Sequence, residues 1–250
     1  MKKLIAGNWK MNNTLEQSVA LATDVMAGLQ ANQDLLSGCD FAVFPPHVHL
    51  TSVRPALGES VELGAQDCSA FSDGAYTGDI SAAMIQDIGC KSVIIGHSER
   101  RQYFNESGQL IADKITQAQE NGLKVILCVG ETDEQRQAGV EQRVIEEQLY
   151  EALPSSVNQD NMVIAYEPVW AIGTGKSATI EDISVMHGFI KEKLAERVEG
   201  NKNLRILYGG SVKPGNAEEI LGLENVDGAL IGGASLKAED FLGIAKAVKG

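Results

Sequence analysis

Residues 125–129 read Val-Ile-Leu-Cys-Val, an unbroken apolar run of the length of one strand. The run lies between two longer segments in which apolar residues recur at helical spacing, Leu110–Gly122 and Glu134–Leu153. An apolar run that does not alternate with polar residues is typical of a parallel strand buried on both faces. The stretch therefore predicts a helix, a buried parallel strand and a second helix.

The same unit recurs on both sides of this stretch. Seven further short apolar runs, separated by segments of helical length, occur at Leu4–Ala6, Phe41–Phe44, Val61–Leu63, Ser92–Ile95, Met162–Ala165, Arg205–Leu207 and Ala229–Ile231. Strict alternation predicts right-handed parallel crossovers, either in an open doubly wound sheet or in a closed barrel. Eight such units in ~250 residues match the size of a (β/α)₈ barrel. We therefore expect an α/β fold with a single (β/α)₈ barrel domain over residues 1–250, and the open sheet is the alternative.

The charge balance argues against several classes of partner. The chain has 21 Lys and Arg against 34 Asp and Glu, which gives a net charge of -13. Nucleic-acid binding depends on basic residues that neutralise phosphates, so we expect no nucleic-acid partner, and an acidic membrane surface would repel the chain as well. A small anionic substrate requires a local positive field that outweighs the overall charge.

The N-terminus and the cysteines predict a cytoplasmic protein. Residues 1–6 include only three consecutive apolar residues, too few for a secretory signal, and no run reaches the ~18 apolar residues of a membrane helix. Cys39, Cys68, Cys90 and Cys128 lack the spacing of a zinc site. We expect buried, reduced thiols and no metal.

Chemically active side chains follow the predicted strands, where both architectures place their sites. Glu167 precedes Pro168, which keeps it out of the helical region and holds its carboxylate at the rim as a candidate general base. His97 comes directly before a predicted helix whose positive end favours a neutral ring. Asn8 and Lys10 share one face if the strand continues, and Lys10 would supply positive field. The alternatives are a solvated carboxylate, a structural histidine and a solvated lysine.

Glycine-rich segments predict an anion site. Residues 173–177 resemble part of a phosphate-binding loop, but Trp170 stands where that nucleotide motif needs its first glycine. A dinucleotide pattern also fits residues 173–178, but it does not follow a strand directly. We interpret Pro168–Ala178 as a lid over a small site. Two later segments, 209–211 and 232–233, would form a phosphate cradle from backbone amides.

Four motifs resemble the triosephosphate isomerase family. They are Ala6-Gly-Asn-Trp-Lys-Met-Asn12, Gly96-His-Ser-Glu-Arg-Arg101, the segment from Ala165 to Gly175 (AYEPVWAIGTG) and Tyr208-Gly-Gly-Ser-Val212. The match runs in order from residue 4 to about 245. It implies the closed barrel and the interconversion of dihydroxyacetone phosphate and D-glyceraldehyde 3-phosphate through an enediolate, in glycolysis and gluconeogenesis, without a cofactor.

The resemblance also implies a role for each matching residue. Glu167 would move the carbon-bound proton, His97 would polarise the carbonyl, Lys10 would attract the phosphate, and Asn8 would bind the substrate oxygens. The residues expected to order Lys10 and the ring are Ser98 and Glu99. The amides expected to bind the phosphate are those of Gly173, Ser211, Gly232 and Gly233.

Family members are homodimers in which the loop after the third strand enters the neighbouring subunit. Here that loop is Gln66–Asp79, and Thr77 is expected near the partner's active site. The loop departs from the family at Asp67-Cys68-Ser69, where an Asn followed by bulkier residues is common. Two other functions remain open: another phosphosugar-processing barrel, such as a metal-dependent epimerase or an aldolase, and a catalytically silent binding barrel.

Overall fold

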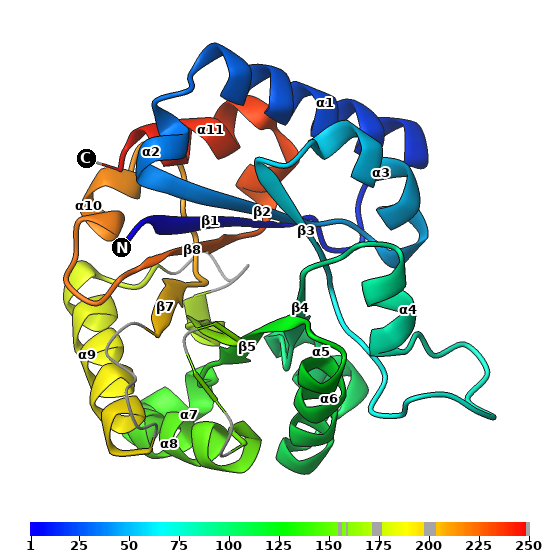
Figure 1. Cartoon of the computed structure of the whole chain (residues 1–250). Helices are drawn as coiled ribbons and strands as arrows, with labels where there is room; N and C mark the ends of the chain where they lie inside the picture. Colours follow the sequence, from blue (N-terminus) through cyan, green and yellow to red (C-terminus); the bar gives the residue numbers. More distant parts are fainter. Residues whose placement is uncertain (155–156, 159, 172–176, 198–203, 249–250) are drawn as a thin grey trace.

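The strands form one closed barrel, in which each strand pairs in parallel with its neighbours along the chain and β8 pairs with β1 (Figure 1). The computed structural model describes residues 1–154, 157–158, 160–171, 177–197 and 204–248. The strands are β1 (Lys3–Asn8), β2 (Cys39–Phe44), β3 (Val61–Ala65), β4 (Ser92–Ile95), β5 (Lys124–Val129), β6 (Met162–Tyr166), β7 (Arg205–Tyr208) and β8 (Gly228–Ile231). The predicted barrel is confirmed, and the open sheet is wrong.

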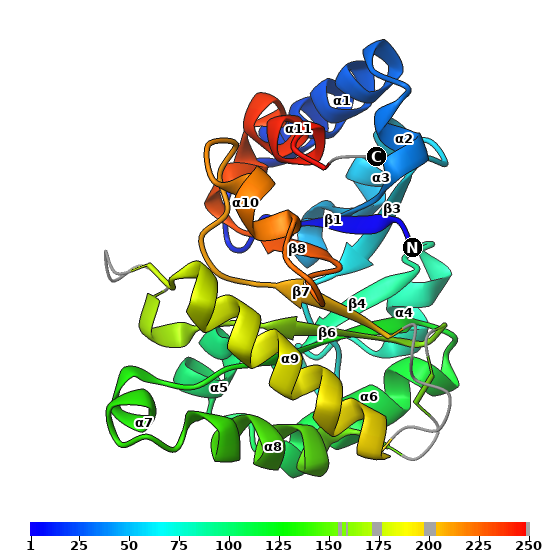
Figure 2. The same ribbon diagram turned by 90° about the vertical axis from the view of Figure 1, so that its left-hand side faces the viewer.

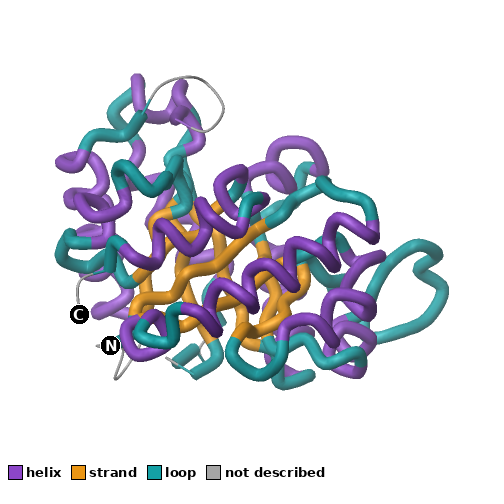
Figure 3. The backbone as a smooth tube through the Cα atoms, turned by 90° about the horizontal axis from the view of Figure 1, so that it is seen from above, coloured by secondary structure: helices purple, strands orange, loops and turns teal. Residues whose placement is uncertain are grey.

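Helices surround the barrel, as the view from above shows (Figure 3). They are α1 (Leu15–Ala31), α2 (Leu35–Gly38), α3 (Leu50–Leu57), α4 (Ala82–Asp87), α5 (Ser98–Phe104), α6 (Gly108–Glu120), α7 (Asp133–Gln137), α8 (Glu141–Ala152), α9 (Ile180–Arg197), α10 (Ala217–Leu221) and α11 (Ala238–Lys246), with short 3₁₀ turns η1 (His47–His49), η2 (Val169–Ala171) and η4 (Gly233–Leu236). Within the described residues, no helix has the length and apolarity needed to cross a membrane.

The strand side chains pack in two separate apolar layers. Alternate residues of a strand point to opposite faces, so Ile94 lies in the cluster that fills the barrel and Ile95 lies in the cluster between strands and helices. Ile126 and Leu127 divide in the same way on the next strand. Because both faces are buried, the strands are apolar along their whole length rather than at every second residue.

One predicted helix is interrupted. The segment Glu134–Leu153 was expected to be continuous, but it contains α7 and α8 with a turn between them. Gly139 in this turn has φ +67, a left-handed conformation that glycine adopts without the penalty of a Cβ atom. The apolar residues of the segment lie in α8, which buries Val144, Ile145 and Leu149, whereas α7 is polar and buries no residue.

The connection from β4 to α5 places a functional residue at a helix start. Gly96 has φ +70, and a Cβ atom there would lie 3.1 Å from Arg101 and 3.2 Å from Ile111. This tight turn makes His97 the residue that caps α5. Ser98 is the first residue of the helix.

Candidate active site

A cavity of about 460 Å³ lies at the mouth formed by the C-terminal ends of the strands. Its lining includes most of the candidate residues, namely Asn8, Lys10, His97, Glu167, Ser211, Gly232 and Gly233. A larger hollow of about 680 Å³ lies at the opposite mouth and contains none of these residues. The parallel barrel therefore brings side chains from distant parts of the sequence into one place, as the positions after the strands predict.

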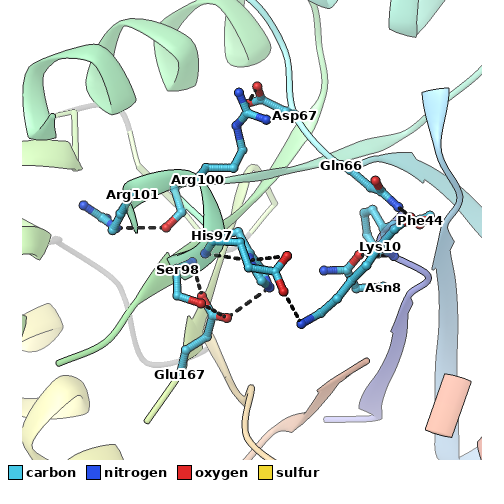
Figure 4. A network of polar contacts seen from close by, with 12 residues as sticks. Asn8, Lys10, Phe44, Gln66, Asp67, His97, Ser98, Arg100, Arg101 and Glu167 are labelled. Carbon is cyan, nitrogen blue, oxygen red and sulfur yellow. Dashed lines mark hydrogen bonds and ion pairs between the residues drawn. The ribbon is translucent and has the colours of Figure 1, made fainter. Parts of the chain in front are cut away.

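Glu167 is held by hydrogen bonds from the start of α5. Its carboxylate is 2% exposed. It accepts hydrogen bonds from the Ser98 N–H at 2.9 Å and the Ser98 hydroxyl at 3.0 Å, and it lies 3.0 Å from Nε2 of His97 (Figure 4). Ser98 was expected to order the His97 ring, and this expectation is wrong: its donors are directed at Glu167.

The hydrogen bonds of His97 indicate a proton on Nε2. Its Nδ1 accepts the backbone N–H of Glu99 at 3.3 Å, while Nε2 faces the Glu167 carboxylate. Nδ1 also lies 3.5 Å from Oε2 of Glu99, a contact that would need a proton on Nδ1. We assign the proton to Nε2 because this tautomer satisfies both of the shorter contacts.

Lys10 reaches the cavity from a turn rather than from a continued strand. Strand β1 ends at Asn8, and Lys10 has φ +50, so the expected extended geometry is wrong beyond residue 8. The Lys10 N–H donates to Oδ1 of Asn8 at 3.0 Å, and its Nζ lies 2.6 Å from Oε1 of Glu99. Trp9 points away into the outer apolar layer. Glu99 therefore contacts the ammonium group that it was expected to order.

Positive charge gathers at the cavity. Besides Lys10, the side chains of Lys213 and Lys237 line it, together with the carboxylates of Glu167 and Asp240. Sequence reasoning missed Lys213 and Lys237. The available signal was their position, two and four residues after the predicted phosphate-binding residues Ser211 and Gly233.

The glycines at the cavity differ in how much space surrounds them. A Cβ atom on Gly209 would lie 2.9 Å from Cγ of Glu167, so only glycine fits beside the carboxylate. Gly232 lies near the Lys10 side chain, and a Cβ atom on Gly233 would meet nothing within 4 Å. Five residues of the predicted lid, 172–176, lie outside the described residues, and Gly173 is one of them.

Two partly buried polar residues that support the site had no predicted role in it. Gln66, directly after β3, donates to the carbonyl of Lys10 at 2.9 Å and to that of Phe44 at 2.8 Å, and so holds the Lys10 turn. Arg101 donates to the carbonyls of Gly96 and Cys128 at 2.9 and 3.0 Å. Burial lowers the pKa of Arg101. The position of Gln66 next to a strand end was the signal that could have identified it.

Glu131 anchors the start of the segment after β6. Its Oε1 accepts hydrogen bonds from the Trp170 indole at 2.7 Å and the Tyr166 hydroxyl at 3.0 Å, and Arg136 lies 3.2 Å away. Desolvation raises the pKa of Glu131. This carboxylate has no exposed surface and fixes the backbone that follows Glu167.

The arrangement suits proton transfer beside a carbonyl group. A carboxylate, an imidazole whose Nε2 faces that carboxylate and a lysine side chain line the same cavity. Such a set can remove a carbon-bound proton while stabilising the oxyanion that forms. In the described part of the chain, no group of three or more His, Cys, Asp or Glu residues could hold a metal ion.

Along nearly its whole length, the chain is similar to proteins of one family. The family model described as triosephosphate isomerase matches residues 3–248. Proteins named triosephosphate isomerase from Pelodictyon phaeoclathratiforme and Magnetococcus marinus are each 49% identical to the chain, over 98% and 97% of both sequences. The crystal structure of triosephosphate isomerase from Bartonella henselae is 41% identical, with a TM-score of 0.91 over 99% of each chain.

Proposed function

The chain belongs to the triosephosphate isomerase family, and on this premise we propose how its own residues interconvert dihydroxyacetone phosphate and D-glyceraldehyde 3-phosphate. This isomerisation is a step of glycolysis. It moves one proton between neighbouring carbons and one between their oxygens, with no net oxidation, so it needs no redox cofactor. The observation that carries the proposal is the meeting of Glu167, His97 and Lys10, from three different strand ends, in one cavity.

Glu167 is the general base in this mechanism. Its carboxylate takes the proton from the carbon beside the carbonyl, the C–H electrons form the C=C bond of an enediolate, and the carboxylate returns the proton to the other carbon. The hydrogen bonds from Ser98 support a carboxylate that is kept oriented before substrate arrives. To reach a substrate carbon, Glu167 must leave Ser98.

His97 acts on the substrate oxygens. Its Nε2–H donates a hydrogen bond to the carbonyl oxygen, and the ring then moves a proton from one oxygen of the enediolate to the other. The start of α5 supports a neutral ring, because the positive end of a helix opposes a cation there. The hydrogen bond from the Glu99 N–H to Nδ1 supports the same tautomer.

Lys10 stabilises negative charge on the substrate. Its ammonium group is positioned by Glu99 and attracts the phosphate and the developing oxyanion, while Asn8 binds the substrate oxygens. Lys213 and Lys237 on the cavity wall add to the positive field. These lysines supply locally the charge that the chain as a whole lacks.

The phosphate binds to backbone amides at the ends of β7 and β8. We assign this role to Ser211, Gly232 and Gly233, which line the cavity, and to Gly173. Backbone N–H groups in glycine-rich turns bind phosphate without a side chain that would block its approach. The phosphate then interacts both with the lysine side chains and with the backbone amides.

We also infer that the protein is a homodimer that forms through the loop Gln66–Asp79. The loop projects away from the barrel between β3 and α4 (Figure 1). At its tip, the Phe71 and Tyr76 rings stack with centroids 3.9 Å apart and remain 45% and 43% exposed. A stacked apolar pair in solvent is typical of a surface that a partner covers.

The face around the loop offers a matching hollow. It has a volume of about 380 Å³ and is lined by residues of the loop base and of α5 and α6, including Phe104 and Lys114. Further exposed apolar side chains are Met11, Val48, Met84 and Tyr103. In a two-fold dimer, each loop enters the hollow of the other copy. We propose that Thr77 of the loop then lies near the partner's active site.

We further propose that residues 1–250 fold as one domain, since the pairing of β1 with β8 joins the two ends of the chain in one barrel. The proposed location is the cytoplasm, and the same reaction run in reverse would serve gluconeogenesis. The domain proposal rests on the fold, and the proposals on location and on gluconeogenesis rest on the reaction.

A coupled assay tests the function against its alternatives. The enzyme is given D-glyceraldehyde 3-phosphate with and without a metal chelator. In both assays an NADH-consuming dehydrogenase detects the dihydroxyacetone phosphate that forms. We expect full turnover. Loss of turnover on chelation would indicate a metal-dependent phosphosugar enzyme, and no turnover under either condition would indicate a silent barrel.

A further inference from the structure

A second hollow lies at the mouth formed by the N-terminal ends of the strands. It has a volume of about 680 Å³ and shares no lining residue with the active-site cavity. Figure 2 shows the N-terminus of the chain at the right-hand end of β1, which is the side of this mouth. The isomerase mechanism makes no use of it.

A buried hydroxyl group without a partner lines this hollow. Ser92, the first residue of β4, is 1% exposed, and its Oγ forms no hydrogen bond within the described part of the chain. Ile94 lies in the cluster that fills the barrel, and residues two apart share a face, so Ser92 points to the inside as well. A buried hydroxyl with no partner costs free energy, which a ligand that accepts its hydrogen bond would offset.

Two lysines stand beside this hydroxyl. Lys124, the first residue of β5, pairs in register with Ser92 and lies two residues before the inward-facing Ile126. Lys91 lines the hollow from the residue before β4. The ammonium groups of Lys91 and Lys124 form no ion pair or hydrogen bond with any residue that the structure describes. One hydroxyl and two ammonium donors therefore surround the same space.

The carboxylates of the hollow do not cancel this charge. The lining holds five basic and three acidic residues, an excess of two positive charges in a chain whose net charge is -13. Asp40 is already neutralised by an ion pair with Arg205 across the mouth. Glu59 is exposed at the edge, and Glu62 lies on β3 beside the hollow. Glu62 would oppose an anion, which makes it useful in the test.

We propose that the N-terminal mouth is a second binding site, which takes a phosphate group of a small molecule. Lys91 and Lys124 contact the phosphate oxygens as point charges, and the Ser92 hydroxyl donates the third hydrogen bond. A doubly charged oxyanion matches two free ammonium groups better than a single carboxylate does. Inorganic phosphate and a phosphate monoester share this chemistry.

Equilibrium dialysis with labelled inorganic phosphate counts the sites. The wild-type protein is expected to bind two phosphates per chain, one at each mouth. Lys124→Met should raise the dissociation constant of the second phosphate about tenfold, because a charge-assisted contact is lost. The active site is monitored separately by phosphate as a competitive inhibitor of the isomerase. Its inhibition constant and the isomerase kcat/KM should stay within about twofold of wild type.

Two further variants separate an anion site from a structural role. Ser92→Ala should weaken the second phosphate severalfold without lowering the free energy of unfolding of the phosphate-free protein, because the hydroxyl loses no bond there. Glu62→Gln should raise the affinity for the second phosphate severalfold, because it removes a negative charge beside the anion. Dialysis of phosphate monoesters on the same variants distinguishes inorganic phosphate from a larger metabolite as the preferred source.

Three results would overturn the proposal. The first is one phosphate per wild-type chain, bound only at the active site. The second is an affinity for the second phosphate that neither Lys124→Met nor Ser92→Ala changes. The third is weaker binding in Glu62→Gln, which would mean that the hollow requires its carboxylate and takes a cationic or zwitterionic molecule instead.

Discussion

Glu167 and His97 depend on each other for orientation. The carboxylate receives the Ser98 donors and lies 3.0 Å from Nε2 of His97, whose other nitrogen accepts the Glu99 N–H. These contacts fix the orientation of both groups. At the scale of single residues, the substrate must therefore draw Glu167 away from Ser98 before proton transfer can begin.

Removing the base should abolish most of the turnover. In Glu167→Gln the amide cannot accept the carbon-bound proton, so we expect kcat to fall by at least ~10²-fold with little change in KM. Steady-state kinetics measures both. The control is Glu147→Gln, which makes the same change at a side chain that is 61% exposed on α8, and it should leave kcat unchanged. Equal kcat values for Glu167→Gln and wild type would remove Glu167 from the role of base.

His187 should make stability depend on pH. Burial lowers the pKa of His187 from 6.5 to about 4, and its Nδ1–H donates to the carbonyl of Asn225 at 2.9 Å. Between these two values the unfolded chain binds a proton that the folded chain does not. The free energy of unfolding therefore falls as pH falls from 6.5 to 4, by about 3 kcal/mol for this group.

Urea unfolding of wild type and His187→Gln at pH 7 and pH 5 measures this effect. Wild type should lose about 2 kcal/mol more than the variant between these pH values, since only wild type carries the titrating ring. Both proteins are compared at the same concentration, so that assembly contributes equally. Equal losses in the two proteins would contradict the assignment.

At the scale of elements, short turns with special backbone geometry place the functional groups. Gly96 bends the chain so that His97 caps α5, and the turn at Lys10 brings its ammonium group beside Glu99. Gly139 separates α7 from α8 in the same manner. Each turn is one or two residues long, and each redirects a whole helix or side chain.

Two glycine substitutions should act in opposite directions. Gly139→Ala requires alanine in a left-handed conformation, so we expect the free energy of unfolding to fall by about 1 kcal/mol. Gly188→Ala, inside α9, should raise it by ~0.5–1 kcal/mol through helix propensity. A Cβ atom at either position meets nothing within 4 Å, so packing does not differ. Changes of the same sign in urea unfolding would contradict this explanation.

At the scale of the whole molecule, the two mouths of the barrel and the projecting loop face different environments. The C-terminal mouth holds the reaction, the N-terminal mouth holds the proposed phosphate site, and the loop Gln66–Asp79 carries the proposed dimer contact. The cavities at the two mouths share no lining residue, so a substitution can alter one of them without touching the other.

A charge at the loop tip should dissociate the dimer. Phe71→Asp places a carboxylate where the aromatic pair would be buried, so we expect the dissociation constant to rise by about 100-fold. Analytical ultracentrifugation measures it. Val185→Asp, at a position 49% exposed on α9, is the matched control and should have no effect. A wild-type protein that sediments as a monomer at all concentrations would refute the proposed dimer.

Local patterns were sufficient for the architecture. Apolar runs of strand length alternating with helical segments predicted the eight strands, and the residues directly after those runs predicted which side chains would gather. Both inferences succeed because burial on two faces and position at a strand end depend on neighbours in the sequence. The break at Gly139 was missed because the apolar periodicity comes from α8 alone, and the short polar α7 before the turn buries no side chain.

The sequence alone was sufficient for the barrel, for the family and for the candidates Asn8, Lys10, His97 and Glu167 that line the active-site cavity. Only the tertiary structure decided which groups bond to one another: Ser98 with Glu167, Glu131 with Trp170, and Gln66 with the turn at Lys10. The same holds for the hollow at the N-terminal mouth. Its serine and lysines lie at the starts of strands, and nothing in the sequence distinguishes them there. The physical reason is that these contacts join residues from different strands, and closure of the barrel alone brings them within hydrogen-bonding distance.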